Sequence, residues 1–413
     1  VSQRNINYFK ERAKGGAGLI IVGGAFFSRR AKATSCQIGI DDDNKIPGLR
    51  TLVEAIHAEG AKVAIQIQHP GSENGLIVGG EGPSDQDFCA PSAIPSKLYP
   101  KLIPREMTVE DIKKTVEGFA DAARRAQIAG FDGVEFHGAH GYLITAFLSS
   151  YTNKRTDQYG GNLENRMRFA LEIVERTKEK VGKNFPFWFR INGDDCIKGG
   201  NDLEDYKRIA SKLAEAGVYA LDISAGIMDN ALFPRDPTRL DGGGVGELGH
   251  MYLHPHHHGY NVHLAEEIKK VVDIPVMVVG GINDPLLAEE IIEQEKADLV
   301  CMGRALLADP WLPKKAAEGK LADIRKCIGC LECNEICWAG EPVLCAINPE
   351  CGKEEEYRLQ PARRVKKVMI IGGGPAGMEA ARVSALRGHN VILFDKRNEL
   401  GGTLLEATVP PFK

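Results

Sequence analysis

Seven short apolar runs, each followed by an amphipathic stretch, limit most strongly what this chain can fold into. The runs span residues 18–25, 62–69, 133–138, 185–192, 219–226, 274–281 and 297–304. The stretches between them, such as 202–217, carry apolar residues at helical spacing. Repeated strand–helix units form a parallel sheet. Each run has a polar residue at its C-terminal end, a pattern typical of a TIM barrel. An open doubly wound sheet is the alternative.

The two ends of the chain bear on the strand count. A TIM barrel has eight strands, and the chain opens with Val1 in a stretch that reads as the middle of a helix ending at glycines. We therefore expect the first strand to precede Val1. At the other end, residues 368–397 read as strand, Gly-rich turn, helix and strand, the opening of a Rossmann domain. We predict three parts: a barrel over 1–318, a cysteine-bearing segment over 319–360 and a truncated nucleotide-binding domain over 361–413.

Composition excludes several classes of partner. The net charge of −4 is too mild to indicate nucleic acid, and no run of about 18 apolar residues suggests a membrane helix. The ten cysteines are clustered and no signal peptide opens the chain. Such cysteines are read as metal ligands in a reducing cytoplasm rather than as disulfides.

Two imidazoles and a phenol follow the third run. His137 ends it, His140 comes three residues later and Tyr142 two after that. Imidazole N–H groups can hold a carbonyl or anionic oxygen, and a phenol can deliver a proton. Two alternatives stay open: an H-x-x-H metal site, and histidines that only satisfy backbone groups.

The sequence around these residues resembles a known family. "HGAHGYL" followed by "FLSSYTNKRTDQYGGNLENRMRF" is similar to the signature of the old yellow enzyme flavin reductases, over roughly residues 1–315. The resemblance implies a barrel that binds FMN. It makes His137 and His140 the clamp for the substrate's oxygen and Tyr142 the acid. The loop within 159–169 is then mostly structural, with Asn162 capping the next helix.

The same resemblance assigns FMN contacts to other strand ends. Gln66 would pair with the flavin's pyrimidine edge, Arg190 would stabilise charge near N1, and Gly24 would bring backbone close to the ring. The phosphate would lie at Gly280, Gly281, Gly303 and Arg304, as is common in TIM barrels. From the residues alone, Arg190 could instead pair with a core carboxylate. His69 is expected near the site without a clear role, and the histidines of 254–258 are read as loop.

Five cysteines lie between residues 327 and 345. Cys327, Cys330 and Cys333 form C-x₂-C-x₂-C, which suits an iron–sulfur cluster. Spacing allows either Cys337 or Cys345 as the fourth ligand, and a structural zinc is an alternative. The order barrel, cysteines, nucleotide fold resembles a multidomain subfamily of the 2,4-dienoyl-CoA reductase, enoate reductase and trimethylamine dehydrogenase type. That resemblance implies a [4Fe–4S] cluster and favours Cys345.

The tail carries a dinucleotide fingerprint. Gly372, Gly374 and Gly377 form G-x-G-x-x-G between a strand and a helix, and Asp395 ends the next strand. In the subfamily this half binds the ADP moiety of FAD. Whether the chain by itself holds FAD stays open.

Taken together, the resemblance implies an ene-reductase. NAD(P)H would reduce FAD, electrons would pass through [4Fe–4S] to FMN, and the C=C bond of an α,β-unsaturated carbonyl or enoate would be reduced. An amine dehydrogenase is the first alternative, although the trimethylamine enzyme has a tyrosine where this chain has His137. A diaphorase and a non-catalytic electron-transfer subunit are the others. Relatives are often oligomers, so a homo-oligomer is expected.

Overall fold

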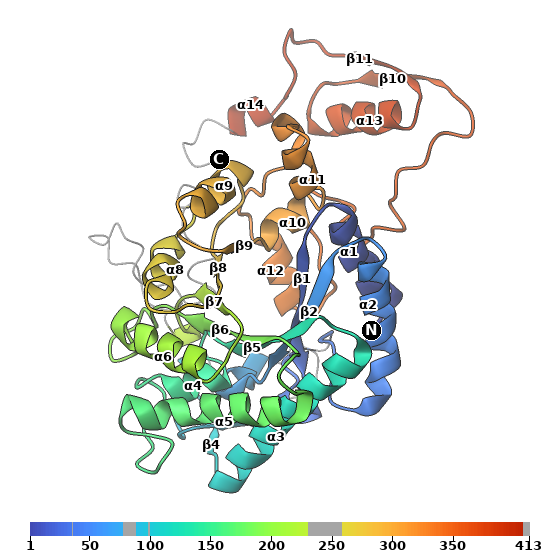
Figure 1. Cartoon of the computed structure of the whole chain (residues 1–413). Helices are drawn as coiled ribbons and strands as arrows, with labels where there is room; N and C mark the ends of the chain where they lie inside the picture. The colour runs from blue at the N-terminus through green and yellow to red at the C-terminus, as the bar shows by residue number, and fades with distance from the viewer. Residues whose placement is uncertain (35, 77–87, 98–99, 230–257, 408–413) are drawn as a thin grey trace. The chain divides into compact units, whose positions relative to one another are not determined.

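The computed structural model describes all of the 413 residues except 35, 77–87, 98–99, 230–257 and 408–413. Those residues are drawn as a thin grey trace in Figure 1. The described chain divides into two compact units. The first ends at Gly352 and the second begins at Lys353.

A seven-stranded parallel sheet forms the first unit. Its strands are β1 (Leu19–Phe26), β2 (Lys62–Gln68), β5 (Gly133–Gly138), β6 (Phe187–Asn192), β7 (Leu221–Ser224), β8 (Val276–Val279) and β9 (Leu299–Cys301), paired in that order. All seven predicted strands are confirmed. The order follows the sequence without the reversal of a doubly wound sheet, so that alternative is wrong. The curled parallel sheet is of the TIM-barrel type (Figure 1). Two short strands, β3 (Cys89–Ala90) and β4 (Arg105–Glu106), pair separately.

Amphipathic helices cover the outside of the sheet. The long ones are α1 (Gln3–Lys14), α2 (Ile46–His57), α3 (Val109–Ala129), α5 (Leu163–Val181), α6 (Leu203–Glu215), α8 (Val262–Lys269) and α9 (Pro285–Glu293). The predicted helix within 202–217 is α6, and Asn162 caps α5 as expected, accepting from Asn165 N at 2.9 Å. The first predicted helix is α1, which ends at Gly15 as expected, and a capping box formed by Ser2 and Asn5 lies at its start.

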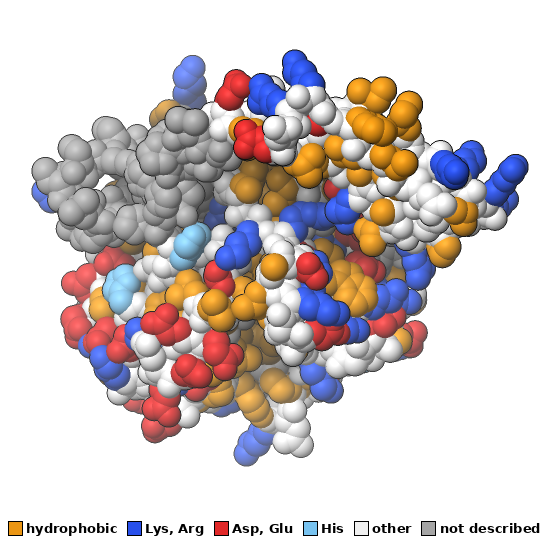
Figure 2. Space-filling view, turned by 90° about the horizontal axis from the view of Figure 1, so that it is seen from above, with side chains coloured by type: hydrophobic (Ala, Val, Ile, Leu, Met, Phe, Trp, Pro, Cys, Tyr) orange, Lys and Arg blue, Asp and Glu red, His pale blue; other side chains and the backbone are white. Residues whose placement is uncertain are grey.

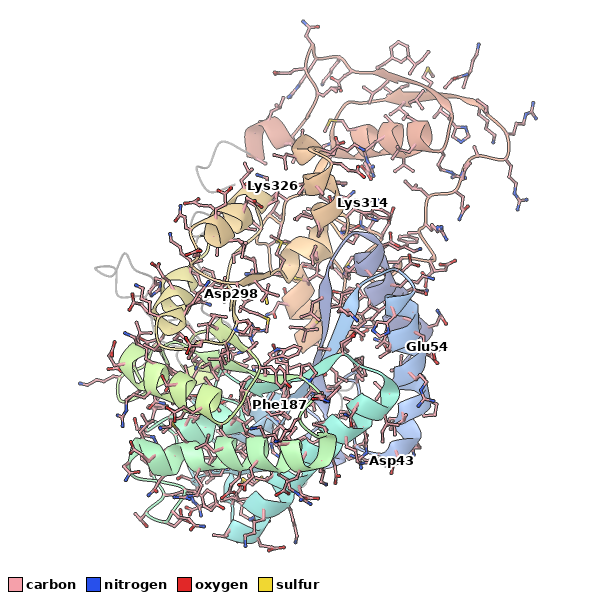
Figure 3. The ribbon with its side chains drawn as sticks, in the orientation of Figure 1. Asp43, Glu54, Phe187, Asp298, Lys314 and Lys326 are labelled. Carbon is pink, nitrogen blue, oxygen red and sulfur yellow. The ribbon has the colours of Figure 1, made fainter. Side chains whose placement is uncertain are left out.

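Among the described residues of this unit, shorter helices lie at loops: α4 (Leu143–Leu148), α10 (Arg304–Ala308), α11 (Leu312–Ala317) and α12 (Glu332–Trp338). Single 3₁₀ turns lie at Arg29–Ala31, Asp43–Lys45 and Leu321–Asp323, and a longer one at Gly71–Leu76. Asp43, labelled in Figure 3, ties its turn to α3 by accepting from Arg124 and Arg125, each at 2.7 Å.

The core lies between sheet and helices and is rich in phenylalanine. Phe119, Phe136, Phe187 and Phe189 are at most 1% exposed, and the Phe136 and Phe189 rings are 5.2 Å apart. Phe187 is labelled in Figure 3. Burying each such side chain contributes about 1.5–3 kcal/mol. This packing fixes the strands whose ends carry the candidate site.

The second unit is a parallel βαβ arrangement. It comprises β10 (Lys367–Ile371), α13 (Pro375–Leu386), β11 (Asn390–Phe394) and the short α14 (Leu404–Ala407). Apolar side chains are visible at the molecular surface (Figure 2). In this unit the exposed ones include Met369, Ile371, Ile392 and Phe394. No helix among the described residues is long and apolar enough to span a membrane.

Candidate active site

The two predicted imidazoles and the phenol meet at the C-terminal end of β5. The rings of His137 and His140 lie edge to face with centroids 5.1 Å apart, and those of His137 and Tyr142 are 4.7 Å apart. His137 and His140 are 5% and 3% exposed. The three side chains converge in one place, as the predicted clamp requires.

Neighbouring strands set the position of His140. Its backbone has φ 66°, a left-handed conformation that is uncommon outside glycine. Asn192, the last residue of β6, accepts from His140 N at 3.2 Å, and Ser224, the last residue of β7, has Oγ 2.7 Å from His140 Nε2. The Ser224 hydroxyl can donate or accept, so it can pair with either tautomer of His140 while it holds Nε2 in place.

His137 is held as a neutral donor. Its Nδ1 accepts from Ala139 N at 3.4 Å, which leaves the proton on Nε2. Burial, with the nearby Arg190 guanidinium, lowers the pKa of His137 well below its usual value. A neutral imidazole with Nε2–H suits hydrogen bonding to a carbonyl oxygen better than it suits proton delivery.

Gln66 on β2 is fixed at both ends of its amide. Nε2 donates to Glu135 Oε1 at 2.6 Å, and Oε1 accepts from Gly24 N at 3.2 Å. Trp188 Nε1 donates to the other oxygen of Glu135 at 2.7 Å. Because Gln66, Glu135 and Trp188 are register partners on β2, β5 and β6, one row across the sheet orients the amide.

A second row holds Arg190. His137, Arg190 and Asp222 are register partners on β5, β6 and β7, and Arg190 Nε lies 3.7 Å from Asp222 Oδ2. Glu135 and Asp222 are 0% and 1% exposed. Burial and the neighbouring Asp222 raise the pKa of Glu135 to about 7, and burial raises that of Asp222. The pairing of Arg190 with a core carboxylate, one of the two interpretations from sequence, is therefore present. It does not exclude a flavin contact.

The predicted phosphate end lies at the tips of β8 and β9, where Gly280, Gly281, Gly303 and Arg304 follow the strands. Gly280 has φ 143°, and a Cβ there would lie 2.7 Å from the Tyr260 ring and 2.8 Å from Asn261 Nδ2, so only glycine fits. Gly303 has open space beside its Cα. Burial raises the pKa of Tyr260 although Arg304 opposes it. Residues of this kind suit a phosphate close to backbone.

A buried carboxyl cluster lies beside Gly141, the residue that follows His140. Ser96 Oγ is 3.1 Å from Glu73 Oε2 and 2.7 Å from Asp229 Oδ1, and Tyr151 donates to Asp229 Oδ2 at 3.1 Å. Burial, then Asp229, raise the pKa of Glu73 to about 8. Glu73, Ser96 and Asp229 line one small hollow together with Gly141. His69 lies close to the start of α4, where its backbone oxygen accepts from Leu143 N at 3.0 Å.

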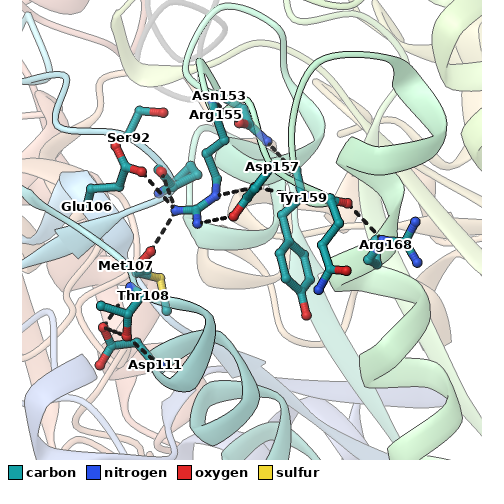
Figure 4. Close-up of polar contacts among 12 residues, drawn as sticks. Ser92, Glu106, Met107, Thr108, Asp111, Asn153, Arg155, Asp157, Tyr159 and Arg168 are labelled. Atoms are coloured by element: carbon teal, nitrogen blue, oxygen red, sulfur yellow. Dashed lines mark hydrogen bonds and ion pairs between the residues drawn. The ribbon is translucent and has the colours of Figure 1, made fainter.

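The loop after α4 is held by Arg155 (Figure 4). This guanidinium donates to the backbone oxygens of Pro91 and Met107 at 3.0 and 2.6 Å and pairs with Asp157 at 2.6 Å. These contacts bind the loop to β3 and β4. They favour a structural rather than a catalytic role for the loop after α4.

Four of the clustered cysteines surround one hollow in the first unit. It is lined by Cys327, Cys330, Cys333 and Cys345, with Arg304 and apolar residues. Cys337 does not line it. Burial and the other three thiols raise the pKa of Cys333 to about 11. Among the described residues no three His, Cys, Asp or Glu side chains lie close enough for one metal ion. Four thiols that line one hollow are the kind of ligand set that holds an iron–sulfur cluster.

The fingerprint in the second unit has the expected geometry. A Cβ on Gly377 would lie 1.8 Å from Gly372 O, so helix and turn approach too closely for any other residue. Gly374 precedes the first residue of α13. Asp395 Oδ2 accepts from Gly373 N at 2.5 Å, which lowers the pKa of Asp395. In Rossmann folds, a turn this close to its helix is the part that lets a dinucleotide approach the backbone.

Several residues of the site were not anticipated. Glu135 and Asp222 are single carboxylates inside apolar strands. A lone charged residue in an apolar strand is the sequence feature that could have identified them. Asn192 and Ser224 end their strands, so the rule that chemistry lies at strand ends could have found them. The tract 254–258 lies outside the described residues except His258, whose Nδ1 is 3.0 Å from Gly281 O.

A TIM-type parallel sheet with this clamp and a glycine-lined strand end defines a class of flavin-dependent oxidoreductases. The chain belongs to the NADH:flavin oxidoreductase / NADH oxidase family, whose model matches residues 1–323. A second model, for FAD-dependent oxidoreductases, matches residues 367–413. The resemblance to the multidomain flavin subfamily is thereby confirmed.

Three relatives indicate the range of the family. The chain is similar to an NADH oxidase of Thermoanaerobacter brockii, 45% identical over all of this chain and 61% of the relative. It is 38% identical to a cinnamate reductase of Clostridium sporogenes, over all of this chain and 62% of that protein. It is 33% identical to an N,N-dimethylglycine/sarcosine dehydrogenase of Chromohalobacter salexigens, over 99% of this chain and 58% of the relative. The chain therefore spans about three fifths of the length of these relatives.

Among solved structures, a 2-naphthoyl-CoA reductase in complex with 2-naphthoyl-CoA superposes with a TM-score of 0.86. It is 34% identical, and the match covers 97% of this chain and 60% of that one. The match therefore extends across the cysteine segment as well as the barrel.

Proposed function

We propose that this protein is a flavin-dependent ene-reductase that uses NAD(P)H to reduce the C=C bond of an α,β-unsaturated carbonyl or enoate compound. The observation that carries the proposal is the meeting of His137, His140 and Tyr142 at the rim of the sheet. His137 offers Nε2–H to the substrate's oxygen, and His140, whose Nε2 meets Ser224 Oγ, would offer an N–H from its other ring nitrogen. Polarising that carbonyl makes the β-carbon electrophilic. Tyr142 delivers a proton to the α-carbon.

FMN fits the residues at the strand ends. Gln66 and Arg190 would meet the isoalloxazine, Gly24 would let it approach the backbone, and the phosphate would lie against Gly280, Gly281, Gly303 and Arg304. When bound there, FMN supplies the hydride. Arg190, charged and 22% exposed at its side chain, provides a fixed positive charge at the same rim.

The other cofactors belong to the same proposal. Cys327, Cys330, Cys333 and Cys345 would hold a [4Fe–4S] cluster that relays single electrons. Gly372, Gly374, Gly377 and Asp395 would hold part of FAD. A small unsaturated substrate, a homo-oligomeric assembly and a cytoplasmic location complete it.

Amine dehydrogenation is the alternative function, because one of the relatives is an N,N-dimethylglycine/sarcosine dehydrogenase. A neutral His137 that donates to oxygen argues for a carbonyl substrate instead. The test is an anaerobic single turnover of dithionite-reduced protein against enoates, enoyl thioesters, unsaturated ketones and amines, followed at the flavin absorbance. We expect reoxidation by alkenes and a saturated product. With Tyr142→Phe, we expect a loss of about 10²–10⁴-fold with FMN content unchanged. Turnover of an amine without any alkene reduction would overturn the proposal.

A further inference from the structure

The cysteine that does not line the cluster hollow lies beside a cysteine of the barrel. Cys36, in the loop after β1, donates through Sγ to the backbone oxygen of Gly340 at 3.0 Å, although the two are 304 residues apart in sequence. Gly340 N in turn donates to Cys337 O at 3.1 Å. Cys36 therefore contacts the same turn at the end of α12 that begins at Cys337.

Both thiols are accessible from solvent. Cys36 and Cys337 are exposed, whereas Cys89 and Cys351 are buried. Partial desolvation, and then the neighbouring Cys36, raise the pKa of Cys337. For Cys333, by contrast, the neighbouring thiols that raise the pKa are those of Cys327, Cys330 and Cys345. Cys36 and the five cysteines of 327–345 thus fall into two groups, a set of four around the hollow and a pair outside it.

We propose that Cys36 and Cys337 are a redox-active dithiol that closes to a disulfide across the barrel and the cysteine segment. In the reaction, two S–H bonds break and one S–S bond forms between the Sγ atoms. A small-molecule disulfide of the glutathione class takes the electron pair and the two protons, and leaves as two thiols. The proposal is independent of which substrate the barrel reduces.

Closure would have a structural effect on the cysteine segment. The bond would join the loop after β1 to the C-terminal end of α12, whose first turn follows Cys330 and contains Cys333. Because a cross-link between distant positions restricts the unfolded chain, the oxidised form should unfold at higher temperature than the reduced form. The four thiols of the hollow take no part, so the iron content should not change.

The test equilibrates the intact protein anaerobically in glutathione buffers of graded potential, traps thiols with iodoacetamide and maps peptides without reduction. We expect a peptide pair linked through Cys36 and Cys337, two fewer alkylated thiols than in the reduced protein, and unchanged iron and visible absorbance. Cys36→Ser and Cys337→Ser should each abolish the linked pair. Cys196→Ser, which removes a thiol elsewhere in the barrel, should retain it.

Two results would overturn the proposal. One is full alkylation of both cysteines in wild-type protein at every potential up to pure oxidised glutathione. The other is loss of iron in Cys337→Ser, since that would return Cys337 to the cluster ligands. The first result needs no variant, so a folding defect in either serine protein leaves the proposal falsifiable.

Discussion

Glu135 holds the amide of Gln66 at 2.6 Å while its second oxygen takes the indole N–H of Trp188 at 2.7 Å. Two donors thus converge on one buried carboxylate from the strands on either side. The orientation of Gln66, the residue proposed to meet the pyrimidine edge of the flavin, depends on a side chain that would not itself touch the flavin.

Replacing Glu135 by Gln tests this dependence. The amide has one acceptor oxygen for two donors, so either Gln66 or Trp188 must lose its partner, at a cost of about 1–3 kcal/mol. We expect the unfolding free energy to fall by that amount and FMN to bind about ten-fold more weakly, measured by urea titration and by flavin fluorescence.

The matched control is the double variant Glu135→Gln/Trp188→Phe. It removes the competing donor, so the glutamine oxygen can serve Gln66 alone. FMN affinity should recover relative to Glu135→Gln. If the double variant binds FMN no better than the single one, Glu135 does not act through Gln66.

Ser224→Ala tests the orientation of His140. The change removes the hydroxyl whose Oγ lies 2.7 Å from His140 Nε2, so the imidazole loses a hydrogen bond that holds its orientation. Because a lost hydrogen bond of this kind costs about 1–3 kcal/mol, kcat/KM for an unsaturated carbonyl should fall about ten-fold. Ser224→Thr keeps the hydroxyl and should retain most activity. Equal losses in both variants would show that packing, not the hydroxyl, matters.

Glu73 should make stability depend on pH. Its pKa is raised from 4.5 to about 8, so between these values the folded protein holds a proton that the unfolded chain has released. The unfolding free energy must then fall as pH rises through this window and is unaffected by Glu73 below it.

Glu73→Gln should remove that contribution. We expect wild-type protein to lose more stability between pH 5.5 and 8 than the variant does, as read from urea midpoints at the two pH values. Glu54, an exposed glutamate on α2 labelled in Figure 3, provides the control, since Glu54→Gln should leave the wild-type slope unchanged. Parallel slopes for wild type and Glu73→Gln would contradict a protonated Glu73.

The choice of the fourth cluster ligand can be settled by paired serine variants. Cys345 lines the hollow with the other three thiols, and Cys337 does not. Cys345→Ser should lose most of the iron and the broad visible absorbance, and Cys337→Ser should keep both. Iron analysis and absorbance of the purified proteins measure this. The reverse pattern would make Cys337 the ligand.

The sequence sufficed for features that repeat or lie close together along the chain. The seven strands follow from apolar runs, and the His137–Tyr142 group lies within six residues. Contacts such as Gln66–Glu135 and Cys36–Gly340 could not be predicted, because strand register and loop packing bring together residues far apart in the chain. The two carboxyl clusters were missed for the same reason, since a pKa depends on neighbours that only the fold supplies.

The left-handed backbone at His140 restricts how this position can be varied in a protein-engineering library. At φ 66° a β-branched side chain would be strained whatever its chemistry. An alanine would lack the side-chain N–H that the imidazole of His140 provides. Asparagine tolerates this conformation and also carries an amide donor. If position 140 is randomised, we therefore expect the active variants to include His and Asn. The backbone conformation disfavours β-branched side chains regardless of the substrate.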